Sequence, residues 1–212
     1  MFRLFYCHKG IKLSRILIEK MRKLIAAINM TLDGYCDHTA IIPDEDIHQH
    51  YTDLLHEADS ILYGRITFQL MEFWRTILEK PTGEKSMDDF AVAIDKIPKI
   101  VFSTTLKSLD WKTARLAGKD LKTEVVELKQ KAGKDIFVGS PGLIVSLMNL
   151  NLVDELQLCI HPVITGSGLP LFKNITNRVE LNLQKAKTFR CGAVIHYYET
   201  IKSGEYFSDN PV

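Results

Sequence analysis

The chain has 212 residues, of which 46% are hydrophobic and 25% are charged, a composition typical of one globular domain. Its formal net charge of +1 provides no overall field that would attract nucleic acid or an acidic membrane surface, so we expect neither as a partner. No apolar run reaches the roughly 18 residues of a membrane-spanning helix.

Cysteines and histidines give no sign of a disulfide framework or a metal site. The four cysteines are scattered and form no CxxC pair: Cys7, Cys36, Cys159 and Cys191. This pattern predicts reduced thiols and a cytoplasmic protein. His48, His50 and His56 share one segment but lack the i, i+4 spacing of helical zinc pairs, so we predict no metal.

We predict one structured domain, residues 21–202, between two short terminal segments. Residues 1–20 are interrupted by basic side chains and do not read as a signal peptide. We interpret them as an N-terminal extension, either disordered or upstream of the true start, because Met21 directly precedes a strand pattern. Residues 203–212 are interpreted as a C-terminal tail.

In the first half of the domain, short apolar strands alternate with amphipathic helices. We predict strands over 23–30, 60–63 and 99–103. A helix over 46–58 would be capped by Asp46, with Gln49 three residues later. The next helix should follow Gly64 and place these apolar residues on one side: Ile66, Leu70, Phe73 and Trp74. The polar segment 79–89 is predicted to be a surface loop.

The second half continues this alternation and then changes. We predict a helix over 119–132 that ends at Gly133, a strand over 135–138, and a helix with Leu143, Leu147 and Leu150 on one face. A strand over 155–164 precedes an antiparallel hairpin formed by 179–189 and 193–201. The alternation implies right-handed crossovers and a mixed α/β domain with both sheet faces covered.

The segment FVGSPGLIVSLM, residues 137–148, has the elements of a phosphate-binding turn. Gly139 and Gly142 would let the backbone turn and approach a ligand, and the following helix would direct free N–H groups at an anion. The segment matches neither GxGxxG nor a Walker sequence. A plain strand-to-helix turn therefore remains the alternative.

Two further strand ends carry groups that suit an anion. In YGRITF, Arg65 stands at a helix start, where the helix dipole needs no cation, so it either meets an anion or is an exposed surface residue. The hydroxyls of Ser103, Thr104 and Thr105 could contact a ribose or phosphate, or cap the next segment. Three such strand ends on one edge are the pattern of nucleotide sites in open α/β sheets.

From Met21 to about Ile201 the chain resembles the dihydrofolate reductase-like family. The matching pieces are INMTLDGY, ADSILYGRITFQLMEFW, KIVFSTTL, DIFVGSPGLIVSLMNLNLVDELQLCIHPVITGSGLPLF and the terminal hairpin. They are most similar to the C-terminal reductase domain of bacterial riboflavin-biosynthesis proteins (RibD C-terminal-like) and its stand-alone relatives. The resemblance implies a three-layer fold with a mixed, mostly parallel central sheet, helices on both faces and a C-terminal antiparallel hairpin. It also implies an oxidoreductase that uses NADPH.

The resemblance assigns the cofactor-binding residues position by position. Arg65 and Thr67 would lie against the phosphates, and Ser103 and Thr104 near the adenosine ribose and its 2′-phosphate. The pyrophosphate would rest on the amides of four residues: Gly139, Ser140, Gly142 and Leu143.

It also assigns a mouth where the nicotinamide would meet the substrate. Thr31 and Asp33 would lie there, together with the loop that contains Gly166 and Gly168. The proton would come from Asp33, or from His48 directly or through water; alternatively Asp33 only forms a turn. Trp74 would wall the substrate pocket or pack in the core.

Departures from the family pattern limit what can be inherited. Relatives often have a basic residue where this chain has Thr104, which weakens the case for a 2′-phosphate. Dihydrofolate reductases keep a carboxylate where His48 falls, so folate reduction is not expected. The chain also lacks the deaminase domain of bifunctional riboflavin enzymes, so their substrate cannot be carried over.

We therefore expect an enzyme that transfers hydride from NADPH to a C=N or carbonyl carbon of a small heterocyclic substrate, as in 5-amino-6-(5-phosphoribosylamino)uracil reductase or dihydrofolate reductase-like enzymes. The alternative is a non-catalytic dimeric protein that binds a nucleotide or small molecule on the same fold. The resemblance also implies a homodimer, in which the terminal hairpin would have its exposed edge strand covered.

Overall fold

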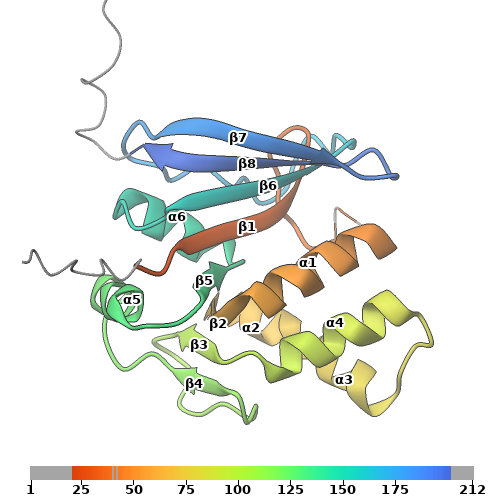
Figure 1. Cartoon of the computed structure of the whole chain (residues 1–212), viewed down its shortest axis with the longest axis horizontal. Coiled ribbons are helices and arrows are strands. Elements are labelled where there is room, and N and C mark those ends of the chain that lie inside the picture. The colour runs from red at the N-terminus through yellow and green to blue at the C-terminus, as the bar shows by residue number, and fades with distance from the viewer. Residues whose placement is uncertain (1–20, 40, 42, 202–212) are drawn as a thin grey trace, which may run out of the picture.

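One eight-stranded sheet organises the part of the chain that the computed structural model describes, which comprises residues 21–39, 41 and 43–201. The predicted extension 1–20 and tail 203–212 lie outside these residues. The strand order is β4-β3-β2-β5-β1-β6-β8-β7, which Figure 1 shows from bottom to top. The strands are β1 Leu24–Thr31, β2 Ala58–Gly64, β3 Lys99–Phe102, β4 Ala114–Leu116, β5 Asp135–Val138, β6 Glu155–His161, β7 Glu180–Thr188 and β8 Val194–Ile201.

Six helices of the described chain connect and cover these strands. They are α1 Glu45–Glu57, α2 Arg65–Met71, α3 Phe73–Glu79, α4 Lys85–Lys96, α5 Leu121–Gln130 and α6 Pro141–Asn149. Helices α5 and α6 pack on one face of the sheet, whereas α1, α2 and α4 contribute to the core on the other face. Figure 1 shows α5 and α6 apart from the α1, α3 and α4 group. The predicted three-layer fold is confirmed.

Strand β1 lies at the centre of both cores because its apolar residues face both sides. Leu24, Ala26 and Ile28 belong to the core under α5 and α6, and Ala27 belongs to the opposite core. β1 pairs in parallel with β5 on one side and with β6 on the other. A strand buried on both faces needs a nearly continuous apolar sequence, as found here.

The parallel part of the sheet ends at β6, and the antiparallel hairpin predicted near the C-terminus follows. Strand β8 pairs antiparallel with β6, and β7 pairs antiparallel with β8. A register shift between Leu183 and Lys185 marks a bulge in the exposed edge strand β7. Bulges and edge lysines are features that discourage pairing with a further strand.

The N-cap of α1 differs from the prediction. The carboxylate of Asp44 accepts the backbone N–H of Ile47 at 3.0 Å, so Asp44 caps the helix. Asp46 lies in the first turn and binds Arg190 through two hydrogen bonds of 2.7 and 3.0 Å. The sequence pattern gave the cap to Asp46 because Gln49 completes a capping box with it, but its carboxylate is already occupied.

The segment between β2 and β3 also differs. The predicted loop 79–89 is a loop only over 80–84, because α3 extends to Glu79 and α4 begins at Lys85 and packs Ala91 and Ile94 into the core. The predicted helix after Gly64 is interrupted at Glu72, which separates α2 from α3. Ile66 and Phe73, which we expected on the apolar side of this helix, are 64% and 56% exposed. Phe68 is buried instead.

Smaller differences affect strand and helix ends. The short strand β4 was not predicted, and the strand predicted over 155–164 ends at His161. Leu147 of α6 is fully buried as expected, whereas Leu150, just beyond the helix, is 37% exposed. Among the residues described, no helix combines the length and apolarity required to cross a bilayer.

Lys99, at the start of β3, is a buried cation held by neutral groups. Its side chain is 1% exposed, and its Nζ donates to the carbonyl of Ile97 at 2.9 Å and to Thr113 Oγ1 at 2.8 Å. The ammonium also lies 4.1 Å from the centroid of the Trp111 ring. Burial lowers the pKa of Lys99 to about 8, with Asp95 acting in the opposite direction.

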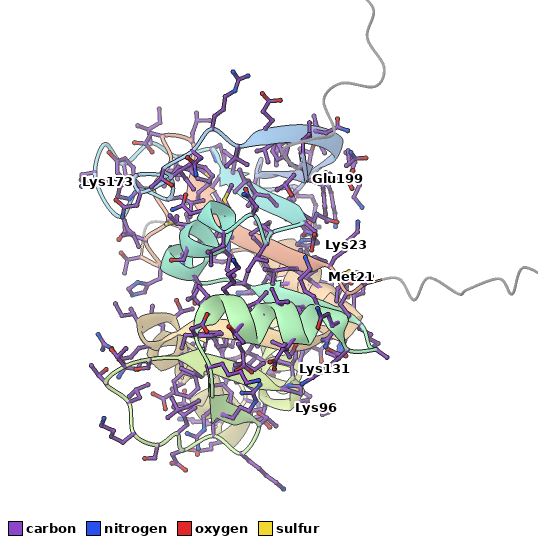
Figure 2. The ribbon with its side chains drawn as sticks, turned by 90° about the vertical axis from the view of Figure 1, so that its left-hand side faces the viewer. Met21, Lys23, Lys96, Lys131, Lys173 and Glu199 are labelled. Carbon is purple, nitrogen blue, oxygen red and sulfur yellow. The ribbon has the colours of Figure 1, made fainter. Side chains whose placement is uncertain are left out.

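A folded-state pKa below that of the unfolded chain makes stability depend on pH. Between pH about 8 and pH about 10.5 the unfolded chain binds more protons at Lys99, so its contribution to stability increases as the pH rises. We expect the unfolding free energy of wild type, relative to Lys99→Met, to increase by roughly 1 to 3 kcal/mol across this window. Urea unfolding at several pH values measures it. The exposed Lys96, labelled in Figure 2, provides the control Lys96→Met, which should show no such trend; a flat difference for Lys99→Met would contradict the prediction.

Candidate functional site

The loops that follow five adjacent strands meet at one edge of the sheet. Strands β3, β2, β5, β1 and β6 are neighbours in that order and run parallel, so their carboxyl ends share this edge. Every predicted cofactor-binding residue follows β2, β3 or β5. The structure therefore brings the three predicted anion-binding segments together on consecutive strands.

A side-chain hydrogen bond joins two of these segments directly. Ser140 is 3% exposed, and its Oγ accepts the backbone N–H of Gly64 at 3.0 Å. Ser140 is the N-cap residue of α6, yet its hydroxyl bonds to the last residue of β2 and does not cap its own helix. The first turns of α2 and α6 are thus held side by side.

Both helices begin without a side-chain cap and without an acidic residue in the first turn. Their first backbone N–H groups and the positive ends of their dipoles are therefore not neutralised by the chain's own carboxylates. By contrast, α1 is capped by Asp44 and has Glu45 in its first turn, and α5 is capped by Asp120. Paired uncapped helix starts free of acids fit an anionic diphosphate.

The two glycines of the predicted phosphate-binding turn are not required by its backbone conformation. Neither Gly139 nor Gly142 has a positive φ, so the turn itself does not require glycine. A Cβ built at Gly142 would meet no heavy atom within 4 Å and would project into open space. The absence of a side chain at Gly142 therefore leaves space for a ligand beside the first backbone amides of α6, including that of Leu143.

The predicted phosphate and ribose contacts lie on neighbouring strands with their side chains partly accessible. Arg65 is exposed and hydrogen-bonds Gln69 at 3.1 Å, whereas Thr67 is half-buried. The Ser103 hydroxyl accepts the backbone N–H groups of Thr105 and Leu106, which is the capping role left open above. Thr104 is exposed beside it.

The mouth is built from two loops that hydrogen-bond to each other. Thr31 is fully buried and donates from Oγ1 to Asp33 Oδ1 at 2.6 Å, and Asp33 Oδ2 accepts the N–H of Gly166 at 2.7 Å. Gly168 has a φ of +140°, and a Cβ there would lie 2.1 Å from a carboxylate oxygen of Asp37, so glycine is required. Gly166 and Gly168 thus lie against the loop that follows β1, in contact with Asp33 and Asp37.

These hydrogen bonds affect the charge of Asp33. The Thr31 hydroxyl, assisted by the N–H groups of Gly166 and Thr165, lowers the pKa of Asp33. Its carboxylate accepts bonds that stabilise the ionised form. Asp33 therefore has the properties of a loop anchor and makes a poor proton donor.

A pocket of about 550 Å³ lies beside this edge, between the starts of α1, α3 and α4. We call it the His48–Trp74 pocket. Its lining includes Asp44, Glu45, His48, Phe73, Trp74 and Glu84. Trp74 contacts His48 edge-on at 5.7 Å between ring centroids and Phe90 at 4.5 Å. Two residues that we named as site candidates, His48 and Trp74, thus share one pocket.

His48 is the titratable group best placed in this pocket. Burial lowers its pKa, while Asp44 and Glu84 act in the opposite direction. A half-buried imidazole with a lowered pKa can pass a proton at moderately acidic pH and is neutral above it.

Sequence reasoning missed two sets of polar residues near the mouth. Asp44 and Glu84 enter the pocket from segments 40 residues apart, and no local pattern could have paired them. His161 ends β6 beside Thr31, is 6% exposed, and its Nε2 lies 3.0 Å from Asn29 Oδ1. The available signal was a histidine within an apolar strand pattern, followed by proline.

A second hollow, of about 370 Å³, lies at the opposite edge, by the amino ends of the parallel strands. Figure 2 shows this edge through Met21, Lys23 and Glu199, with Lys173 on the far side of the molecule. The basic groups of the hollow are paired with carboxylates, as for Lys129 with Asp154 and Lys23 with Glu155. It is therefore not the site that the three anion-binding segments form.

The Gly64–Ser140 bond can be tested by removing its acceptor. Ser140→Ala would leave the N–H of Gly64 without its partner in a partly buried setting, and we expect a loss of about 1 to 3 kcal/mol of unfolding free energy. The matched control is Ser146→Ala in the same helix, where the exposed hydroxyl bonds only the carbonyl of Gly142; we expect less than about 0.5 kcal/mol. Urea unfolding measures both. Equal losses would show that the bond has no special role.

Comparisons with known proteins agree with this architecture. The chain is 36% identical over 181 residues to the uncharacterized protein YyaP of Bacillus subtilis (strain 168), covering 82% of this chain and 93% of YyaP. A solved structure of a protein assigned to riboflavin biosynthesis from Shewanella sp. PV-4 has a TM-score of 0.66 at 18% identity, covering 85% of this chain and 99% of that one.

Another solved structure is the deaminase/5-amino-6-(5-phosphoribosylamino)uracil reductase of Thermotoga maritima, with a TM-score of 0.57 at 15% identity. The match covers 86% of this chain and 57% of that bifunctional protein. At these identities the structures establish the fold. The family model of the RibD C-terminal domain matches residues 22–197, and the chain therefore belongs to the RibD C-terminal domain family.

Proposed function

We propose that this protein is an NADPH-dependent reductase that transfers a hydride to a small heterocyclic substrate in the cytoplasm. The observation that carries the proposal is the pair of uncapped, acid-free helix starts at α2 and α6, held together by Ser140 at the edge where five strands end. Family membership supports a reductase-like activity, since this family includes the reductase domain named above.

In this proposal the amides of Gly142 and Leu143 hold the pyrophosphate, as the room above Gly142 allows. Arg65 approaches the phosphates from the start of α2, with Thr67 two residues further along. Ser103 and Thr104 border the ribose. Thr104 provides a hydroxyl and no positive charge, so discrimination between NADPH and NADH would depend on Arg65 and on backbone groups.

The cofactor supplies the hydride, and the protein supplies orientation, a partly dry pocket and the proton. Thr31 and Asp33 fix the loop at the mouth. His48 delivers the proton to the substrate directly or through one water. The aromatic walls of the His48–Trp74 pocket hold the ring of the substrate next to the nicotinamide.

The second candidate is a binding protein of the same fold that catalyses no reaction. It is favoured by the departures from the family pattern at Thr104 and His48. Both candidates include a homodimer as a proposal. Strand β7 is an exposed edge, but its bulge and its lysines Lys185 and Lys187 argue against simple strand pairing, so contact through the hairpin face is the better arrangement. Light scattering that gave a monomer mass at micromolar concentration would remove the dimer.

Cofactor binding provides the first test of the function. We expect NADPH to bind with a Kd on the order of micromolar, and Arg65→Ala to weaken binding at least tenfold, about 1.4 kcal/mol. Fluorescence titration of both variants with NADPH and NADH measures this. Arg178→Ala is the control, because Arg178 is exposed and pairs with Glu180 near β7. If neither nucleotide binds wild type, the reductase proposal fails.

The proton donor provides the second test. Because burial lowers the pKa of His48, the protonated fraction should fall as the pH rises above a pKa that lies below the ordinary 6.5. We therefore expect kcat/KM to decrease with pH over the neutral range. His48→Gln should lower kcat/KM at acidic pH by roughly a hundredfold and remove this pH dependence. NADPH oxidation across a panel of pyrimidine and pteridine substrates measures it; an unchanged profile in His48→Gln would exclude this role.

A further inference from the structure

The two halves of the site have opposite electrostatic character. On the cofactor side, α2 and α6 begin without caps and without acids. On the pocket side, α1 begins with Asp44 and Glu45, and α4 with Glu84 followed by Asp88. We infer that the His48–Trp74 pocket takes a planar heterocycle that carries no phosphate and is uncharged or cationic, an inference that rests on the proposed function.

The shape and chemistry of the pocket walls fit a flat ring. Phe73 is 56% exposed although it is a large aromatic side chain, and its ring lies 5.6 Å from that of Trp74. Trp74 in turn contacts His48 and Phe90. An aromatic ligand that stacks here would cover apolar surface that the protein itself leaves open.

The charged groups of the pocket would repel a phosphate. Three carboxylates line it, from Asp44, Glu45 and Glu84, against one ammonium, from Lys85. That ammonium is bonded to Asp89 one turn further along α4, and the lysine side chain is 81% exposed. A phosphate held here would lose hydration and face a negative lining with no free cation among the described residues that line it.

The N-terminus of α1 is also closed to an anion. Asp44 accepts the N–H of Ile47, so the helix end that borders the pocket already has its own carboxylate. Sites that bind phosphate normally use such a helix end, or arginine and lysine, to hold the oxygens. Here the same position is occupied by negative charge.

The start of α4 provides the hydrogen-bond donors in the pocket. No side chain caps this helix, and Ser86, which is 6% exposed, lies in the pocket lining. Backbone N–H groups and a hydroxyl suit a neutral carbonyl oxygen of the kind found on oxidised pyrimidine and pteridine rings. Because the Glu84 carboxylate lies at the same helix end, this position favours a neutral carbonyl oxygen over a phosphate dianion.

A matched pair of ligands tests the inference without turnover. The pair is 5-amino-6-(5-phosphoribosylamino)uracil, the compound named for the Thermotoga maritima enzyme, and the same compound without its phosphate. Binding is followed by tryptophan fluorescence of the full chain without nucleotide. The chain has two tryptophans, and Trp111 is only 4% exposed, so Trp74 should give the signal. Trp74→Phe should abolish it.

We expect the compound without phosphate to bind at least tenfold more tightly than its phosphorylated form. In the double variant Asp44→Asn, Glu84→Gln this ratio should fall below about threefold, and Asn at position 44 preserves the helix cap. The control Asp53→Asn removes an exposed carboxylate of α1 that does not line the pocket, and should leave the ratio unchanged.

Three results would overturn the inference: tighter binding of the phosphorylated compound, no binding of either compound at millimolar concentration, or a ratio unaffected by the double variant. None of them bears on the nucleotide titration with Arg65→Ala. The failure of this inference can therefore be distinguished from the failure of the proposed function.

Discussion

The insertion of β5 between β1 and β2 is the constraint on which the site depends. β5 pairs in parallel with both neighbours, and Phe137 is in register with Ile25 of β1 and Ile61 of β2. Because all three strands point the same way, the chain after β5 must emerge between the chains after β1 and β2. The Gly64–Ser140 hydrogen bond then fixes that adjacency at the level of individual atoms. A ligand at this edge can contact segments far apart in sequence without any of them having to move.

The distribution of acidic residues divides this edge into two parts. A helix start attracts negative charge, and proteins usually neutralise it with their own carboxylates. Here α1 and α5 follow that practice, with Asp44 and Asp120 as caps, while α2 and α6 do not. Leaving two adjacent helix starts without caps costs stability unless a ligand supplies the missing charge. The division thus separates a part suited to an anionic cofactor from a part suited to a substrate of different charge.

Much of the fold could be predicted from the sequence because its strands are short, apolar and separated by marked turns. The terminal hairpin and the central strands were placed correctly within a few residues. Helix α4 was not predicted because the residues on its buried side are mostly small: Ser86, Ala91 and Ala93. Such residues give a weak apolar pattern, and here they follow a turn-rich segment. The cap of α1 was misplaced because the competing partner of Asp46 is Arg190, which lies 144 residues later in the chain.

The site was predictable where local motifs place groups at strand ends, and unpredictable where function depends on contacts between motifs. The sequence marks Asp33 as the prominent acid at the mouth, but Thr31 and the amides of the Gly166 loop occupy its carboxylate and keep it ionised. A carboxylate stabilised in this way holds two loops in place and gives up its ability to donate a proton. In our proposal that task falls to His48, whose setting beside Trp74, Asp44 and Glu84 arises only when α1, α3 and α4 come together. The sequence can therefore name His48 as a candidate, but it cannot give the protonation behaviour of that residue, because this comes from burial and from neighbours supplied by other helices.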